Sequence, residues 1–145
     1  MKFTREHLEY AQSRVRLSKF SALMGFEVVK LSNGGAILTV TTGDRHRQIH
    51  NVMHGGVIAA LADTAAAIAA YTVVPPGTEV VTIELKINYF RPVIDGTVEA
   101  RARIVNGGKT VVYLECDVTS VPDGKLIAKA TSTCLVLRGD QAKGR

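Results

Sequence analysis

The chain has 145 residues, of which 46% are hydrophobic, so it is long enough for one domain with a real core and short for two. Charged residues make up 21%, which excludes wholesale disorder. The formal charge of +5 could attract nucleic acid, but the basic residues are dispersed and have no interleaved aromatics, so we expect no nucleic-acid partner.

The N-terminal residues predict no secretory signal, because residues 1–10 are charged and mixed. Two cysteines, Cys116 and Cys134, fit no metal or redox spacing and alternate with apolar residues. We therefore expect both to be small buried hydrophobes in a protein of the reducing cytoplasm.

The first part of the chain predicts one helix and two strands. Residues 4–18 read as an amphipathic helix with Thr4 as its cap. Residues 26–31 and 36–42 read as strands joined by Asn33-Gly34-Gly35, a strong hairpin signal. A polar, irregular segment follows over 43–53.

An alanine-rich run over 57–71 predicts the central helix, which two glycines precede and Pro75-Pro76-Gly77 stops. A helix that is apolar on every side must be buried. Asp63 therefore lies where a carboxylate is costly, which indicates a role other than packing. The same carboxylate, together with His54, opposes insertion into a membrane, so we expect no membrane span.

His54 and Asp63 are nine residues apart, which places them roughly 13 Å apart on opposite sides of a helix. They cannot serve one site within one chain. If both are functional, another copy of the protein or other segments of this one must complete the site.

From Glu79 onward the apolar period changes to two, which predicts strands. In the first of them this alternation places Tyr89 on the apolar side and Thr82 on the polar side. Turn residues at 95–96, 106–108 and 122–124 separate them, and residues 139–145 read as a frayed polar tail. The expected architecture is α+β: two strands, one buried helix and a four-strand antiparallel meander, forming a curved six-stranded sheet around the helix. The four later strands are predicted at 81–89, 98–104, 112–118 and 126–137.

Four motifs carry a resemblance to a known family. They are H-G-G at 54–56, L-A-D at 61–63, V-T-I-E-L-K-I-N-Y-F-R-P at 81–92, and the strand start from Gly96. Over residues 20–137 the chain resembles the hotdog fold, and more narrowly the PaaI-like and hydroxybenzoyl-CoA-thioesterase-like acyl-CoA thioesterases. The resemblance implies a single hotdog domain over 1–145, with residues 1–19 as an N-terminal helix.

The resemblance also implies catalytic residues. The helix opening at His54-Gly55 matches the place that holds the thioester carbonyl oxygen, and Asp63 matches the nucleophile or the base for water. Gln48 matches a side-chain amide position, and Thr82 matches a hydroxyl that helps to hold the water. Members with glutamine at the amide position often carry glutamate in the helix, whereas this chain has Asp63. Because aspartate is one methylene shorter, a bridging water is favoured over direct attack. A helix N-terminus suits an oxyanion through its unpaired N–H groups and dipole.

Further residues are assigned to the substrate. Basic side chains could contact coenzyme A phosphates, although solvated surface charge is the default for Arg91, Lys109 and Lys125. No cofactor or metal is expected, because coenzyme A belongs to the substrate and the histidines at 46, 50 and 54 end in a loop without acidic partners. The substrate-binding set is Gly56, Arg91, Asn106, Gly108 and Lys109.

Three functions remain open on the sequence. The first is an acyl-CoA thioesterase. We expect it to act at least as a homodimer and to assemble into a homotetramer. The second is a hotdog hydratase or dehydratase, although the chain lacks the closely spaced aspartate–histidine pair that such enzymes show. The third is a non-catalytic module that binds acyl thioesters. The acyl group, and the choice between coenzyme A and an acyl carrier protein, are left open.

Overall fold

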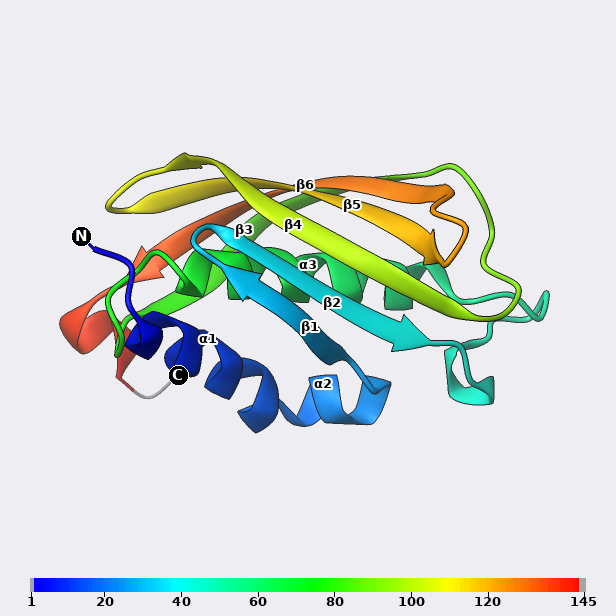
Figure 1. Cartoon of the computed structure of the whole chain (residues 1–145), viewed down its shortest axis with the longest axis horizontal. Coiled ribbons are helices and arrows are strands. Elements are labelled where there is room, and N and C mark those ends of the chain that lie inside the picture. Colours follow the sequence, from blue (N-terminus) through cyan, green and yellow to red (C-terminus); the bar gives the residue numbers. More distant parts are fainter. Residues whose placement is uncertain (1, 144–145) are drawn as a thin grey trace.

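A six-stranded antiparallel sheet curves around one long helix, α3 (Gly55–Tyr71), in the computed structural model, which describes residues 2–143 (Figure 1). This is the expected α+β hotdog arrangement. The strands are β1 (Glu27–Ser32), β2 (Gly35–Thr41), β3 (Glu79–Tyr89), β4 (Thr97–Gly107), β5 (Val111–Val121) and β6 (Leu126–Leu137).

The strand order is β1-β2-β4-β5-β6-β3, so the predicted four-strand meander is wrong in one respect. Only β4, β5 and β6 form a meander, whereas β3 pairs with β6 at the far edge and β4 pairs with β2. The seven residues between β3 and β4, 90–96, form no strand and give the chain room to return to β2. Alternation along each strand predicts the faces of a strand but not its neighbours, which is why the sequence did not reveal this crossover.

The central helix ends at Tyr71, four residues before Pro75, so the prolines do not themselves stop it. Thr72 lies at its C-terminus, where the hydroxyl donates to Ala69 O at 2.7 Å and accepts from Gly34 N at 2.8 Å. The helix end is thus tied to the β1–β2 turn. Proline disfavours the helical conformation of the residue before it, so Pro75 keeps the helix from resuming after this point.

One stripe of α3 is not fully buried, contrary to the expectation of a helix enclosed on all sides. Leu61, Ala62 and Ala65 are completely covered, while Ala60, Asp63 and neighbouring residues keep partial exposure. This stripe lies where the curved sheet does not reach. It consists of Gly56, Ala60, Asp63, Thr64 and Ala67.

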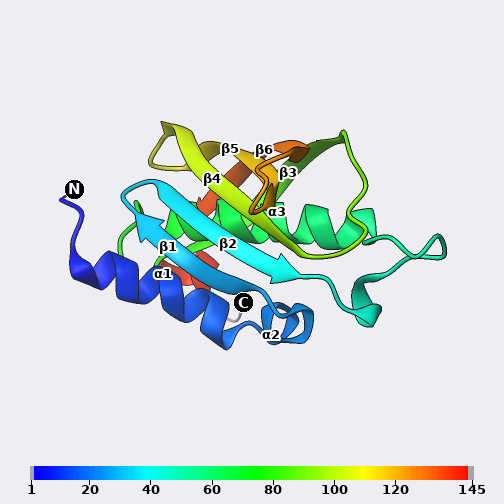
Figure 2. The ribbon, with the colours of Figure 1, turned by 45° about the vertical axis from the view of Figure 1, so that its right-hand side comes forward.

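Two helices precede the sheet: α1 (Arg5–Leu17), with Thr4 as its N-cap, and the short α2 (Lys19–Met24), which the sequence analysis did not predict. Ser18 separates them and caps α2 by accepting from Ser21 N at 3.1 Å. Figures 1 and 2 show α1 beside β1, on the side of α3 opposite the sheet. No helix in the described part of the chain is both long and apolar enough to cross a bilayer.

Two further predictions concern the cysteines and the C-terminal tail. Cys116 and Cys134 are both free and buried, as expected from their alternation with apolar residues. Of the predicted frayed tail, residues 139–142 form an exposed 3-10 turn, and residues 144–145 lie outside the described residues.

Candidate active site

Asp63 and Thr82 meet between the middle of α3 and the start of β3. The Thr82 hydroxyl donates to Asp63 Oδ1 at 2.7 Å. Within residues 2–143 the structure gives Asp63 Oδ2 no hydrogen-bond partner. The carboxylate is partly exposed rather than enclosed, so it is held by one oxygen and free to react with the other.

A β-bulge at Ile83 places Thr82 on the helix side of the sheet. In the β3–β6 pairing, Thr82 lies opposite Cys134 and Glu84 lies opposite Thr133, which leaves Ile83 as an extra residue. The prediction that Thr82 lies on the polar side of its strand is therefore wrong. A simple alternation through 81–89 misses the one-residue change of phase that a bulge introduces, and bulges are common next to active sites.

Cys134 lies beside this pair and was not expected there. Its Sγ is 4.0 Å from Thr82 Oγ1 and 3.9 Å from the hydroxyl of Ser132. Burial raises the pKa of the Cys134 thiol above its ordinary value. The thiol therefore stays neutral near pH 7, which makes it a packing residue beneath Asp63 rather than a second nucleophile.

The N-terminus of α3 leaves one backbone donor free. His54 is the N-cap, and its Nδ1 accepts from Gly56 N at 2.7 Å, while Val57 N donates to His54 O at 2.9 Å. Among the described residues Gly55 N–H has no such acceptor. An unpaired N–H at the positive end of a helix is suited to an oxyanion.

Tyr89 supports this turn, a contact that the sequence analysis missed. Its hydroxyl donates to Gly55 O at 2.7 Å, and a Cβ added to Gly55 would stand 3.3 Å from the tyrosine ring. The bulge at Ile83 also puts Tyr89 on the helix side, opposite Ala128. Tyr89 was predicted to face inward, but nothing in its spacing points to the carbonyl of Gly55.

Gln48 lies in the loop before α3, next to the helix N-terminus. Its side-chain oxygen accepts from the backbone N–H of His50, which leaves the amide nitrogen available. A surface recess is lined by Arg47, Gln48, Ile49, His50, His54 and Gly55. The structure therefore brings together three predicted residues, Gln48, His54 and Gly55.

The predicted substrate-binding residues divide between two ends of the sheet. Arg91 lines an adjoining depression with Gly55 and Tyr89, and its guanidinium donates to Leu126 O at 2.9 Å. Gly56 lies on the exposed side of the helix N-terminus. By contrast, Asn106, Gly108 and Lys109 lie at the β4–β5 turn, beyond the other end of α3 (Figure 1).

The three regularly spaced histidines do not converge. His46 is 2% exposed, accepts from Gly43 N through Nδ1 at 2.9 Å and bonds Met24 O through Nε2 at 2.8 Å. His50 and His54 are exposed on the loop and the helix cap. No group of three or more metal-ligating side chains is found within residues 2–143. His46 is thus a structural residue.

Two half-sites result within one chain. Asp63 lines a groove between α1 and α3, and none of the residues that line this groove also line the recess at Gly55. The structure places Asp63 beside Thr82 and Gln48 beside Gly55, and the catalytic roles of these residues stay predictions. The two halves remain separate, as the helical spacing of His54 and Asp63 requires.

A six-stranded antiparallel sheet curved around one helix, with a carboxylate on that helix and a free N–H at its start, defines a hotdog-fold hydrolase. Residues 50–127 match the model of the thioesterase superfamily. The chain belongs to this superfamily and is a thioester hydrolase.

Relatives of known structure or name agree with this membership. The phenylacetic acid degradation protein PaaI from Thermus thermophilus is 34% identical, with a TM-score of 0.74, covering 81% of this chain and 98% of that one. A thioesterase from Haemophilus influenzae is 28% identical, with a TM-score of 0.80, covering 95% and 93%. The 1,4-dihydroxy-2-naphthoyl-CoA hydrolase of Listeria monocytogenes is 28% identical over 78% of this chain and 91% of its own length.

Proposed function

We propose that this protein hydrolyses an acyl-CoA thioester, with Asp63 as general base or nucleophile and the N-terminus of α3 as the oxyanion site. The observation that carries the proposal is the pair of complementary half-sites, a carboxylate oriented by Thr82 and an unpaired N–H at Gly55. The naphthoyl-CoA hydrolase among the relatives supports coenzyme A as the carrier.

The chemistry follows from the two groups. The thioester carbonyl oxygen accepts from Gly55 N–H, which stabilises the negative charge that develops on it. Asp63 takes a proton from a water molecule, whose oxygen bonds to the carbonyl carbon. The C–S bond of the tetrahedral intermediate then breaks to release the carboxylic acid and a coenzyme A thiolate. Because a thiolate leaves readily, one base and one oxyanion site are sufficient.

The use of a water molecule is favoured over direct attack by Asp63. Thr82 already donates to Asp63 Oδ1, so only Oδ2 is left to act on water or on the carbonyl carbon. The aspartate side chain is one methylene shorter than glutamate, which leaves room for water between carboxylate and substrate. Gln48 contributes its free amide N–H groups beside the oxyanion site.

The complete site is formed by two copies of the chain. A second copy would cover the start of the partly exposed stripe of α3, at Gly56 and Ala60, and the edge strand β3, where Ile83 is 58% exposed. In a two-fold dimer Asp63 of one copy would face Gly55 of its partner, and two equivalent sites would form. Arg91, near Gly55, would contact the phosphates of coenzyme A.

A thiol-release assay with a panel of acyl-CoA substrates tests the proposal. We expect turnover by the wild-type protein and its loss in Asp63→Asn. Tight binding without turnover for every substrate would instead indicate a binding module, and release of thiol only from acyl carrier protein thioesters would change the carrier. The expected assembly into homotetramers and the cytoplasmic location stay predictions, which sedimentation and fractionation would test.

A further inference from the structure

The groove that contains Asp63 continues along α3 beyond the reacting carboxylate. It lies between α1 and α3 and has a volume of about 380 Å³. Ligand pockets commonly have volumes of about 300–1,000 Å³. Asp63 and Tyr71 both line it, and they are eight residues apart on one side of the helix, or roughly 12 Å along its axis. The groove therefore offers length as well as volume next to the site.

Apolar side chains line part of the groove between these ends, alongside serine and threonine hydroxyls. Val15 and Leu17 contribute from α1, and Ala67 and Ile68 contribute from α3. Ala67 lies one turn beyond Asp63, and its small side chain leaves the passage open at that level. An apolar chain attached to a carbonyl at Asp63 would thus contact apolar side chains from both helices.

A cluster of hydrogen-bonded polar side chains closes the far end. Glu79 accepts from Arg14 Nη1 at 2.8 Å, from Tyr71 Oη at 2.5 Å and from Tyr10 Oη at 3.1 Å. The guanidinium of Arg14 also stacks 4.6 Å above the centre of the Tyr10 ring. The side chains of Arg14 and Glu79 are only 27% and 25% exposed, so this ion pair is partly shielded from water.

We propose that this groove holds the acyl chain of the substrate and that Arg14 sets the greatest chain length that is bound productively. This inference rests on the proposed acyl-CoA thioesterase function. A methyl end that reached the cluster would have to separate Arg14 from Glu79 or leave their polar atoms unpaired. Leaving polar groups unpaired away from water costs more free energy than burying one more methylene contributes. The substrate class is therefore an acyl-CoA with an apolar acyl chain of intermediate length.

The groove predicts a characteristic dependence on chain length. Each methylene that enters the groove should raise kcat/KM about fourfold, because burying one CH₂ in an apolar site contributes that factor. The increase should stop once the chain spans the distance from Asp63 to the cluster. The chain length at which the increase in kcat/KM stops, which we call the break, reports the position of the closed end of the groove. The absolute rate does not.

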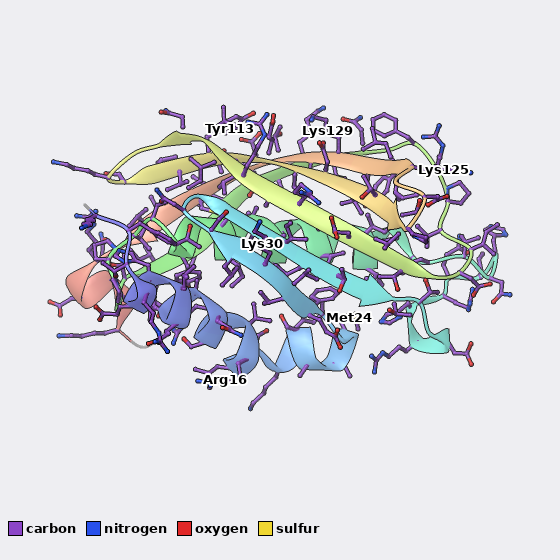
Figure 3. All side chains as sticks on the ribbon, viewed as in Figure 1. Arg16, Met24, Lys30, Tyr113, Lys125 and Lys129 are labelled. Carbon is purple, nitrogen blue, oxygen red and sulfur yellow. The ribbon has the colours of Figure 1, made fainter. Side chains whose placement is uncertain are left out.

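The test compares acetyl-, butyryl-, hexanoyl-, octanoyl-, decanoyl-, dodecanoyl- and palmitoyl-CoA with the full-length wild-type protein and with Arg14→Ala. We expect the break to move to a longer chain in the variant, with about a fifteenfold gain for a substrate two methylenes beyond the wild-type break. Arg16→Ala is the matched control, because Arg16 lies on the same helix, points away from the body of the molecule and does not line this groove (Figure 3).

A second variant covers the case in which Arg14→Ala unfolds the protein. Ala67→Phe should fill the groove partway and move the break to a shorter chain, while the exposed Ala22→Phe in α2 should not move it. A purely structural role for Arg14 would lower the melting temperature and slow all substrates equally. A break that stays in place in both Arg14→Ala and Ala67→Phe would overturn this inference, whereas no turnover with any acyl-CoA would overturn the proposed function itself.

Discussion

Thr82 donates a 2.7 Å hydrogen bond to Asp63 from a strand position that a β-bulge turns toward the helix. The same bulge keeps Tyr89, seven residues after Thr82, on the helix side, where it bonds Gly55 O. One extra residue, Ile83, thus lets β3 support both the carboxylate and the helix N-terminus of its own chain. In the proposed dimer, Asp63 and Gly55 of one chain belong to different active sites, so Thr82 and Tyr89 each support a different site.

Replacing Asp63 with Asn removes the charge at nearly constant volume. We expect the protein to fold normally and kcat to fall at least a hundredfold, equivalent to about 2.7 kcal/mol of transition-state stabilisation. Circular dichroism and the thiol-release assay measure the two effects. Near-normal turnover by the folded variant would remove Asp63 from the mechanism.

Replacing Thr82 with Val removes the only side-chain donor that the described residues give to Asp63. We expect kcat to fall about tenfold with little change in KM, because hydrogen bonds to charged groups contribute about 1.5–3 kcal/mol. Thr133→Val is the matched control, since Thr133 lies on β6 and bonds Glu84 on the outer face of the same strand pair. Equal losses in both variants would indicate a general effect on the sheet.

Substituting Gly55 by Ala should lower kcat more than it raises KM. The added Cβ would stand 3.3 Å from the ring of Tyr89, so the turn must shift by a few tenths of an ångström and the free N–H must move with it. An oxyanion contact is strongest in the transition state. Gly107→Ala, whose Cβ would find ordinary contact distances, serves as the control. An effect on KM alone would mean that this turn binds substrate without stabilising the oxyanion.

Alkaline conditions should destabilise the fold through Cys116. Burial, with a smaller effect of Asp117, raises the pKa of the Cys116 thiol from 9.0 to about 12. The folded state therefore holds this proton more tightly than the unfolded state, so the contribution is complete below about pH 9 and is lost as the pH rises toward 12. Melting temperatures between these limits should fall less steeply for Cys116→Ala. Parallel curves for the two proteins would contradict this prediction.

The sequence predicted the fold and the separation of His54 from Asp63 because both depend on local patterns. The central helix follows from the composition of 57–71, and the opposite facing of His54 and Asp63 follows from helical spacing alone. The face of the sheet on which a strand residue lies is harder to predict from sequence, because the bulge at Ile83 reverses the face predicted for Thr82. The pairing of β3 with β6, and the contact of Tyr89 with Gly55, depend on distant segments that no local pattern records.

The central claim is that each active site takes its helix N-terminus from one copy and its carboxylate from another. His54→Ala removes the cap of Gly56 N–H, and Asp63→Asn removes the base, so each variant alone should be nearly inactive. Unfolded and refolded together, half of the dimers should be mixed, and each mixed dimer should hold one wholly wild-type site.

Thiol release by the refolded mixture is the most direct measurement. The shared-site account predicts a return to roughly a quarter of the wild-type activity. Mass spectrometry that confirms mixed dimers, together with no recovery of activity, would contradict it.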